Sequence, residues 1–216
     1  MGNPEHFGKI KGKIAEVVEK NGKVYKFLHI PVQSGSDDVL KAMKRDYSAK
    51  DYVELTGFFK REIPGVTIET DVIVGFPGET EEDFQKTVGL IEKTRPAITN
   101  VSKFSARPGT AAMRMQQVDG NEIKRRSEVC SEICKRIARE ENEKMVGETG
   151  IALVTERKGI LFSARTANYK TVLLQNAALG GFVKVEIASA EQSHLKCAAS
   201  GQLGQERENA RGHQIL

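Results

Sequence analysis

Three polar residues stand close to two turns of the chain, and their chemistry is complementary. Gln33 follows an apolar segment, Arg45 lies twelve residues further on, and Asp71 falls within a second apolar segment. An amide side chain both donates and accepts hydrogen bonds, and a guanidinium group binds carboxylates as a two-pronged donor. A carboxylate at a strand end accepts from ribose hydroxyls in dinucleotide-binding folds. Together the three residues predict a site for a ligand that carries a ribose and a carboxylate.

Two strand-to-helix turns hold these residues. In the first, a small-residue turn at 34–36 separates an apolar run from a helix that starts with acidic residues. In the second, residues 70–80 repeat the arrangement. Such turns gather ligands at the carboxyl ends of parallel strands. Each residue also has a structural interpretation: Ser36 and Asp37 would cap a helix, and Arg45 would pair with Asp46 or Glu54.

The elements around these turns alternate between helical and strand patterns. Helices are predicted over residues 11–19, 37–44, 81–94 and 121–145, and another begins after Ser48 and ends before Pro64. Strands are predicted over residues 24–32, 66–74 and 98–105. The strand at 66–74 is almost continuously β-branched, which is typical of a parallel strand buried on both faces.

The pattern changes after Gly147, where helical periodicity ends. Five short strands separated by Gly, Asn and Lys turns are predicted at residues 151–155, 161–165, 171–174, 183–187 and 195–198. Five strands in so short a stretch indicate a small β-barrel. We therefore predict an α/β domain over residues 1–145, an all-β domain over 146–200 and a disordered tail over 201–216.

Composition narrows the class of protein. The 216 residues carry a net charge of +4, which permits nucleic-acid binding without requiring it. Three cysteines fit a reducing cytoplasm better than a disulfide framework. Neither a transmembrane-length apolar run nor a secretory signal is present, so a membrane partner is not expected.

Three motifs carry a family resemblance: QSGSD at 33–37, TDVIVGFPGET at 70–80 and FSARPGTAA at 104–112. Their order resembles that of radical S-adenosylmethionine (SAM) enzymes of the tRNA methylthiotransferase family. The residues around 107–113 and 165–169 are most similar to the archaeal and eukaryotic threonylcarbamoyladenosine branch. The resemblance implies a partial (half) radical SAM βα barrel, then a long helix and a small all-β TRAM (OB-like) barrel.

The same resemblance implies a cofactor, a partner and the residues that contact them. The cofactor is SAM, and the partner is tRNA rather than DNA. Arg107 is expected to face the substrate. In the RNA-binding barrel, Tyr169 is expected to be exposed and Phe182 to lie in the core. The implied SAM contacts are Gln33, Ser34, Arg45, Asp71, Phe76 and Pro77, and the implied RNA contacts in the barrel are Arg157, Lys158, Arg165, Tyr169 and Lys170.

The family reaction adds a methylthio group to C2 of N6-threonylcarbamoyladenosine next to the anticodon. It requires a [4Fe–4S] cluster held by three cysteines. Here Cys130 and Cys134 lie one helical turn apart on an apolar face and are predicted to pack as small hydrophobes. Cys197 is expected within the barrel and is no better placed to bind a cluster. We therefore assign no metal ligand and no catalytic residue, and expect a fragment whose cluster-binding region is missing or lies on an N-terminal partner chain.

Two other interpretations stay open from the sequence. One is a stand-alone RNA-binding module in which the remnant of the SAM barrel only supports the TRAM domain. The other is a different methylthiotransferase, acting on isopentenyladenosine in tRNA or on a ribosomal protein.

Overall fold

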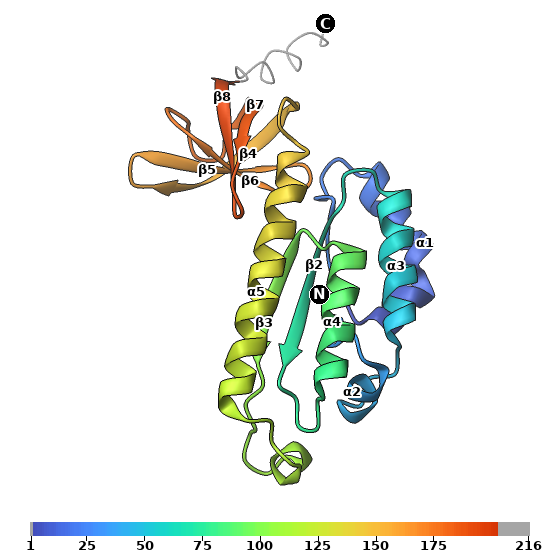
Figure 1. Cartoon of the computed structure of the whole chain (residues 1–216). Helices are drawn as coiled ribbons and strands as arrows, with labels where there is room; N and C mark the ends of the chain where they lie inside the picture. The colour runs from blue at the N-terminus through green and yellow to red at the C-terminus, as the bar shows by residue number, and fades with distance from the viewer. Residues whose placement is uncertain (1, 203–216) are drawn as a thin grey trace, which may run out of the picture. The chain divides into compact units, whose positions relative to one another are not determined.

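The computed structural model describes residues 2–202 of the chain, and the side chains of residues 2–197. The chain divides into two compact units, residues 1–141 and the residues from 142 onward (Figure 1). The last strand runs to Gln202, past the expected start of the tail at 201. The rest of that tail, from residue 203, lies outside the described residues.

Unit 1 alternates helices with three parallel strands, as the sequence predicts. Its sheet has the order β1-β2-β3, and both strand pairs are parallel. Within the described residues, no helix is both long enough and apolar enough to cross a membrane. The elements are α1 (Pro4–Lys20), β1 (Phe27–His29), α2 (Asp37–Ala42), α3 (Ala49–Glu62), β2 (Thr67–Val74), α4 (Glu81–Thr94), β3 (Ile98–Lys103), the 3-10 helix η1 (Ala111–Arg114) and α5 (Gly120–Glu143).

Two helices start at capping boxes that the sequence signals. The Ser48 side chain accepts from the backbone N–H of Asp51, whose carboxylate accepts in return from the Ser48 backbone. Thr80 and Asp83 form the same reciprocal pair at the start of α4. Each box satisfies two backbone donors that a helix start leaves unpaired. The boxes therefore fix the first residues of α3 and α4, and the second box lies directly after the second turn.

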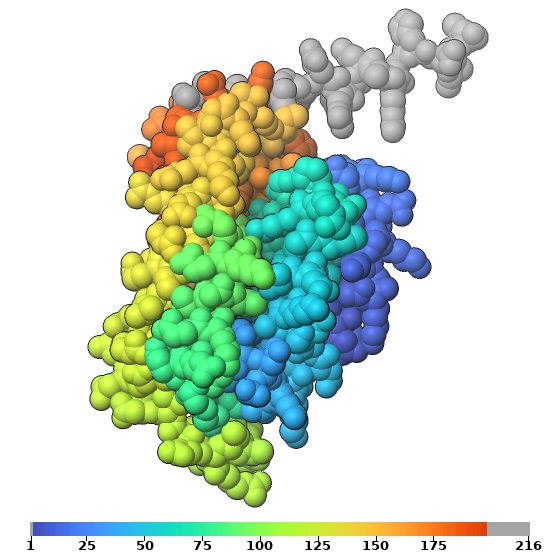
Figure 2. All heavy atoms as spheres, turned by 45° about the vertical axis from the view of Figure 1, so that its right-hand side comes forward, coloured from blue at the N-terminus to red at the C-terminus, as the bar shows by residue number. Residues whose placement is uncertain are grey.

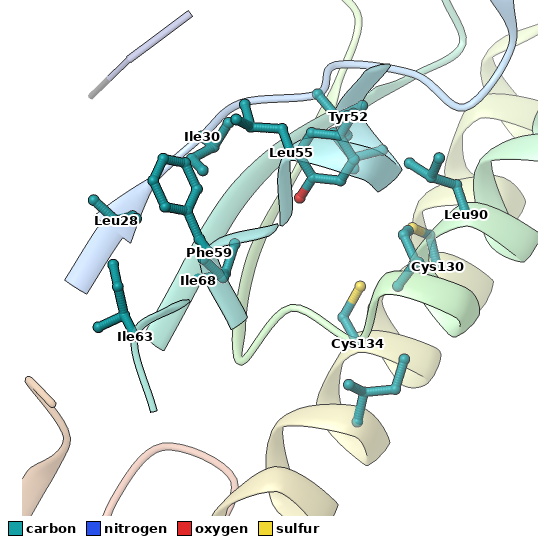
Figure 3. Close-up of a cluster of buried hydrophobic side chains, with 14 of the residues drawn as sticks. Leu28, Ile30, Tyr52, Leu55, Phe59, Ile63, Ile68, Leu90, Cys130 and Cys134 are labelled. Carbon is teal, nitrogen blue, oxygen red and sulfur yellow. The ribbon is translucent and has the colours of Figure 1, made fainter. Parts of the chain in front are cut away.

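The core of unit 1 lies on one face of the sheet. In β2, Ile68, Thr70, Val72 and Val74 are buried, whereas the residues between them are only half-buried. The prediction of a strand buried on both faces is therefore wrong, because α1, α3, α4 and α5 all contribute their core side chains to this one cluster. Figure 3 shows part of the cluster, including Leu28, Ile30, Tyr52, Leu55, Phe59, Ile63, Ile68, Leu90, Cys130 and Cys134.

Helices α3 and α4 lie side by side in unit 1, as Figures 1 and 2 both show. Their carboxyl ends are joined by Lys60, whose Nζ donates to the backbone oxygens of Thr94 at 2.8 Å and Arg95 at 2.9 Å. Carbonyls at a helix end lack intrahelical partners, and a cation there is favourable. This contact fixes α4 and hence the turns that lead into it.

Unit 2 is a closed five-stranded barrel with the strand order β4-β5-β6-β8-β7. All neighbouring pairs are antiparallel except β6 and β8. The five strands that the sequence predicts are all present, and several are longer. They are β4 (Thr149–Lys158), β5 (Leu161–Thr166), β6 (Thr171–Leu174), β7 (Phe182–Ala190) and β8 (Leu195–Gln202), and their core is Ala152, Val154, Ala164, Val172, Leu174, Val183, Val185, Ile187 and Leu195.

Candidate functional site

The first turn brings Gln33 against Asp71 through the backbone. The Gln33 N–H donates to the Asp71 carbonyl at 2.8 Å, and the Gln33 carbonyl accepts from Ile73 N–H at 2.9 Å. Between β1 and this point, the Thr70 hydroxyl bridges the two segments and accepts from Val32 N–H at 3.1 Å. The backbones of two of the three predicted site residues are therefore hydrogen-bonded to each other, three residues before β2 ends at Val74.

Gln33 adopts an uncommon backbone conformation. Its φ is 71°, in the left-handed region that costs a non-glycine residue free energy. The sheet bonds on both sides of the residue hold it there. Its side chain is half-buried, and strain of this kind clusters at ligand sites.

The small residues after Gln33 attach the first turn to α4. The Thr87 hydroxyl lies 3.3 Å from the Ser34 hydroxyl and accepts from Gly35 N–H at 2.9 Å. The Ser36 hydroxyl donates to Asp83 Oδ1 at 2.6 Å, so it does not cap α2 with its side chain. A methyl group on Gly35 would come within 2.5 Å of the α4 backbone. Since Ser34 is fully buried, its expected role as a direct cofactor contact is corrected to support of the turn.

Arg45 lies exposed after α2, near the first turn. Burial raises the pKa of the Tyr47 hydroxyl, and the Arg45 charge opposes that rise. The same hydroxyl donates to the Val32 carbonyl at 3.2 Å, directly before the turn. Among the described side chains, no ion pair joins Arg45 to Asp46 or Glu54, so the structural alternative is not observed.

The second turn is closed by aromatic packing. Phe76 is 7% exposed, and its ring meets Phe104 edge-to-face at 5.1 Å. Pro77 is also buried. Gly75 has a φ of 77°, and a Cβ there would meet the Ile123 side chain at 2.4 Å. Both Phe76 and Pro77, which the resemblance implies as SAM contacts, therefore belong to a packed turn, and any ligand would meet only its outer surface.

A buried ion pair anchors this second turn to α5. Glu79 Oε2 accepts from Gly75 N–H at 2.7 Å and from Arg126 Nη1 at 2.8 Å, and Arg126 Nη1 also donates to the Glu79 carbonyl. Burial raises the pKa of Glu79, while the Gly75 and Arg126 hydrogen bonds oppose the rise. Arg126 binds Glu122 as well, and the hydrogen bonds from Arg125 and Arg126 lower the pKa of Glu122 to about 2.

The half-exposed face of the sheet carries a polar cluster around Asp71. Asn100 Nδ2 donates to Asp71 Oδ1 at 2.9 Å and to Glu69 Oε1 at 2.8 Å. His29 Nε2 lies 3.0 Å from Asp71 Oδ2, but it makes no aligned hydrogen bond. Both oxygens of Asp71 are contacted, so its carboxylate is fixed in orientation.

The cysteines lie where the sequence predicts. Cys130 and Cys134 are buried in the unit 1 core from α5, and Cys197 is half-buried in unit 2. The hydrogen bond to Cys134, together with burial, raises the pKa of Cys130. A cluster ligand must be a thiolate and must reach the iron, so these cysteines do not fit a [4Fe–4S] cluster.

Arg107 is exposed at the start of a tight turn after β3. Its carbonyl accepts from the Thr110 hydroxyl at 2.7 Å, and Gly109 supplies the left-handed residue with a φ of 81°. The turn therefore holds the backbone while the guanidinium group stays in solvent.

On the outer surface of the barrel, β5, β4 and β7 form a cross-strand row. Arg165 pairs with Leu153, and Leu153 pairs with Phe182, so their side chains share one face. The Arg165 guanidinium lies over the Tyr169 ring at 4.4 Å and donates to Thr171 at 2.7 Å. The cation of Arg165 on β5 and the ring of Phe182 on β7 therefore lie on one face with β4 between them, and the Tyr169 ring packs against Arg165 from the turn after β5.

Two expectations for barrel side chains are wrong. Phe182 was expected in the core, yet it is 56% exposed because it shares the outward parity of Lys184 and Glu186. Tyr169 was expected to be exposed but is half-buried beneath Arg165. Lys170 is 9% exposed, which leaves its side chain little surface for a phosphate.

Arg157 and Lys158 lie at the exposed end of β4, as expected of RNA contacts. Arg157 donates to the Gly159 carbonyl at 3.2 Å and stacks over Phe162 at 5.8 Å. Lys158 lies 3.3 Å from Glu156, an exposed pair of little energetic weight.

Sequence reasoning missed the groups that hold the site. Asn100, Glu79 and Arg126 carry no recognisable motif of their own, and their roles depend on contacts between segments far apart in the chain. One signal was present: Glu79 lies inside the second motif, next to the Thr80 that caps α4, in a turn that needs an acceptor for backbone N–H groups.

The chain is similar in sequence to known proteins. The radical SAM superfamily matches residues 7–91, which include both turns. A probable threonylcarbamoyladenosine tRNA methylthiotransferase from Pyrococcus horikoshii is 40% identical over 196 residues, covering 90% of this chain and 46% of that protein. The chain is a relative of the radical SAM tRNA methylthiotransferases.

Other relatives bear the same description. The threonylcarbamoyladenosine tRNA methylthiotransferase of Homo sapiens is 36% identical over 200 residues, covering 91% of this chain and 34% of the human protein. The chain thus spans about half the length of its archaeal relatives and a third of the human one. Among solved structures, Escherichia coli coproporphyrinogen III oxidase has a TM-score of 0.46 at 13% identity over 80% of this chain and 43% of that one, too low to support an argument.

Proposed function

We propose that this chain is the SAM-contacting and tRNA-gripping part of a methylthiotransferase that acts on threonylcarbamoyladenosine. In that reaction a methylthio group is added to C2 of the modified adenosine beside the anticodon. The backbone hydrogen bond that places Gln33 beside Asp71 on adjoining parallel segments carries the proposal. The descriptions of the relatives support the choice of substrate. In this proposal the three-stranded sheet is half of a βα barrel, and unit 2 is a TRAM domain.

The residues of the first turn would hold the nucleoside and amino-acid ends of SAM. SAM supplies the radical chemistry and the methyl group when it is bound. Asp71, fixed by Asn100, would accept from the ribose hydroxyls, and the Gln33 amide would bond beside it. Arg45 has no ion-pair partner among the described side chains, which leaves its guanidinium group available for the carboxylate. Phe76 and Pro77 would contribute the edge of the packed turn to the adenine.

The cluster has no place in this chain, because none of its three cysteines fits one. No step of the reaction is therefore assigned to residues 1–216. Their share is to bind, to orient and to exclude water around the cofactor.

The cross-strand row of Arg165, Leu153 and Phe182 would form the binding surface for tRNA. Phe182 presents an exposed ring on which a base can stack, and Arg165 and Lys184 lie on the same face as cations for phosphate. Arg157, Lys158 and, in unit 1, Arg107 are further exposed cations that would contact RNA.

Titration of tRNA against the chain at two salt concentrations tests this binding surface. Phe182→Ala should weaken binding about tenfold at both salts, because stacking of a base on an aromatic ring contributes about 1–3 kcal/mol. Arg165→Ala should weaken binding and reduce the slope of affinity against salt by about one counterion.

A charge-matched control lies on another strand. Lys196→Ala removes a cation that is paired with Glu191 at 2.8 Å, and it should change tRNA affinity little. Equal losses for Arg165→Ala and Lys196→Ala would show that net charge alone binds the RNA. Unchanged affinity in Phe182→Ala would remove the proposed stacking face.

Asp71 provides the test of the cofactor half. In an assembled, active methylthiotransferase, Asp71→Asn should lower turnover at least about tenfold while tRNA affinity stays nearly constant, because the residue lies in unit 1 and would act on the cofactor alone. The isolated chain should bind SAM weakly or not at all. Tight binding of SAM by the isolated chain, or full turnover of the variant, would contradict the proposal.

A second function, that of a stand-alone RNA-binding module, is favoured by one observation. The cysteines do not fit a cluster, whereas the barrel is closed and presents an exposed cation and aromatic face. Both functions expect tRNA binding. They differ in the effect of Asp71→Asn, which should have no consequence for a module that only binds RNA.

A further inference from the structure

We propose that His29, Glu69 and Asp71 bind one divalent first-row transition-metal ion on the half-exposed face of the sheet. The ligand atoms of the three residues lie within 4.8 Å of one another, close enough to surround one ion. His29 comes from the last position of β1 and pairs with Glu69 in β2, whose next same-face residue is Asp71. The register of these adjacent parallel strands thus places the three side chains next to one another on one face.

Two features point to a bound cation rather than to an ordinary surface cluster. His29 Nε2 is a buried nitrogen without an aligned hydrogen bond, although Asp71 Oδ2 lies only 3.0 Å away. Glu69 and Asp71 are like charges on one face, and among the described side chains the amide of Asn100 donates a hydrogen bond to each of them. A cation would use the free nitrogen and reduce the repulsion between the carboxylates.

Asn100 prepares the two carboxylates for a common ligand. Its Nδ2 binds Oδ1 of Asp71 and Oε1 of Glu69, which leaves Asp71 Oδ2 turned toward His29. Partners of this kind orient metal ligands, and their removal typically costs about 10–100-fold in affinity. The ligand set of one imidazole and two carboxylates suits zinc, cobalt, manganese or ferrous iron, with remaining positions open to water.

This inference does not require the proposed function, but both use the carboxylate of Asp71. A metal ion and a ribose hydroxyl would exclude each other at Asp71 Oδ2, so SAM binding should be measured with a chelator present.

Titration of the chain with Co²⁺ at neutral pH, followed by visible absorption and by calorimetry, tests the site. We expect one equivalent to bind, with ligand-field bands of a nitrogen and oxygen site and without sulfur charge-transfer bands. His29→Gln should weaken Co²⁺ binding by more than about a hundredfold, and Asn100→Ala by roughly 10–100-fold.

The matched control is His6→Gln, which removes an exposed histidine of α1. It should leave Co²⁺ binding unchanged, and circular dichroism should show that all variants keep the helical signal. Because Asp71→Asn keeps the side-chain shape, it tests the site again should His29→Gln fail to fold. The proposal is overturned by the absence of saturable binding, by equal binding in His29→Gln and the parent chain, or by sulfur charge-transfer bands that assign the ion to a cysteine.

Discussion

The two strand-to-helix turns of unit 1 are both held in place by side chains from neighbouring helices, but the interactions differ in kind. The first turn is held through hydroxyl groups: Thr87 contacts Ser34 and Gly35, and Ser36 donates to Asp83. The second is held by the buried ion pair of Glu79 and Arg126, whose side chains are 0% and 5% exposed. Hydroxyl networks lose little when one member is removed, whereas a buried charge that loses its partner is costly.

A single carboxylate joins the two turns. Asp83 Oδ1 accepts from the Ser36 hydroxyl of the first turn at 2.6 Å, and Oδ2 accepts from the Thr80 hydroxyl and backbone of the second. The residue that caps α4 therefore also sets the spacing of the two turns. A change in one turn is transmitted to the other through the start of one helix.

The largest effect is expected from Arg126→Met. This change leaves Glu79 buried with only the Gly75 N–H, and it should lower the free energy of unfolding of unit 1 by about 3–5 kcal/mol at pH 7. The loss should be smaller at pH 5, because burial raises the pKa of Glu79 and the unpaired carboxyl can then take up a proton. Urea unfolding followed by the helical circular dichroism signal, which arises from residues 4–143, measures both values.

Arg125→Met is the control, since it removes the neighbouring arginine, which is 47% exposed and also pairs with Glu122. This change should lower the free energy of unfolding of unit 1 by less than about 1 kcal/mol. Adding Glu79→Gln to Arg126→Met should recover part of the lost unfolding free energy. A double-mutant cycle then gives the coupling free energy between Glu79 and Arg126. Equal losses of unfolding free energy in Arg126→Met and Arg125→Met would show that burial of the ion pair adds nothing to its contribution.

A smaller effect with a distinct pH dependence is expected from Asp83→Asn. The amide offers one acceptor where the carboxylate offers two, so the free energy of unfolding should fall by about 1.5–3 kcal/mol at pH 7. Burial acts to raise the pKa of Asp83, but the bonds from Ser36 and Thr80 outweigh it and hold the pKa below its ordinary value of 3.8. The stabilisation is thus complete above that value and is lost as pH falls through the lower folded-state pKa.

The exposed neighbour Glu82 supplies the comparison. Glu82→Gln removes the same charge from the same helical turn, but its partner is only the surface residue Lys86 at 2.9 Å. Its effect should stay within about 0.5 kcal/mol at every pH. A stability difference between Asp83→Asn and the parent chain that persists undiminished at pH 2 would contradict the role of the carboxylate charge.

Much of this framework was predictable from sequence, because its signals are local. Ser48 and Thr80 stand at helix starts with an acidic residue three positions on, and that spacing alone predicts the capping boxes that form. The alternation of elements likewise predicts a parallel sheet that brings Gln33 near Asp71. The ion pair of Glu79 and Arg126 was not predictable, because it joins residues 47 positions apart.

The barrel shows where a local rule was available but was not applied. Val183, Val185 and Ile187 share one parity of β7 and fill the core, which forces Phe182 outward with Lys184. Period-2 alternation predicts this, whereas the expectation that an aromatic residue is buried does not. Lys170 could not be placed from sequence, since its burial follows from how the turn after β5 closes on Thr166, whose hydroxyl accepts from Lys170 N–H at 3.0 Å.

The smallest effect that separates the two turns is expected from Ser34→Ala. The change removes one neutral hydroxyl, while Thr87 keeps its bond to Gly35 N–H, so unit 1 should lose about 0.5–1.5 kcal/mol in urea unfolding. Ser105→Ala, at an exposed serine of the same unit, should change the free energy of unfolding by less than about 0.5 kcal/mol. A loss in Ser34→Ala as large as that in Arg126→Met would show that the hydroxyl network is as indispensable as the ion pair. The two turns would then differ in the residues that hold them but not in how much those residues contribute to stability.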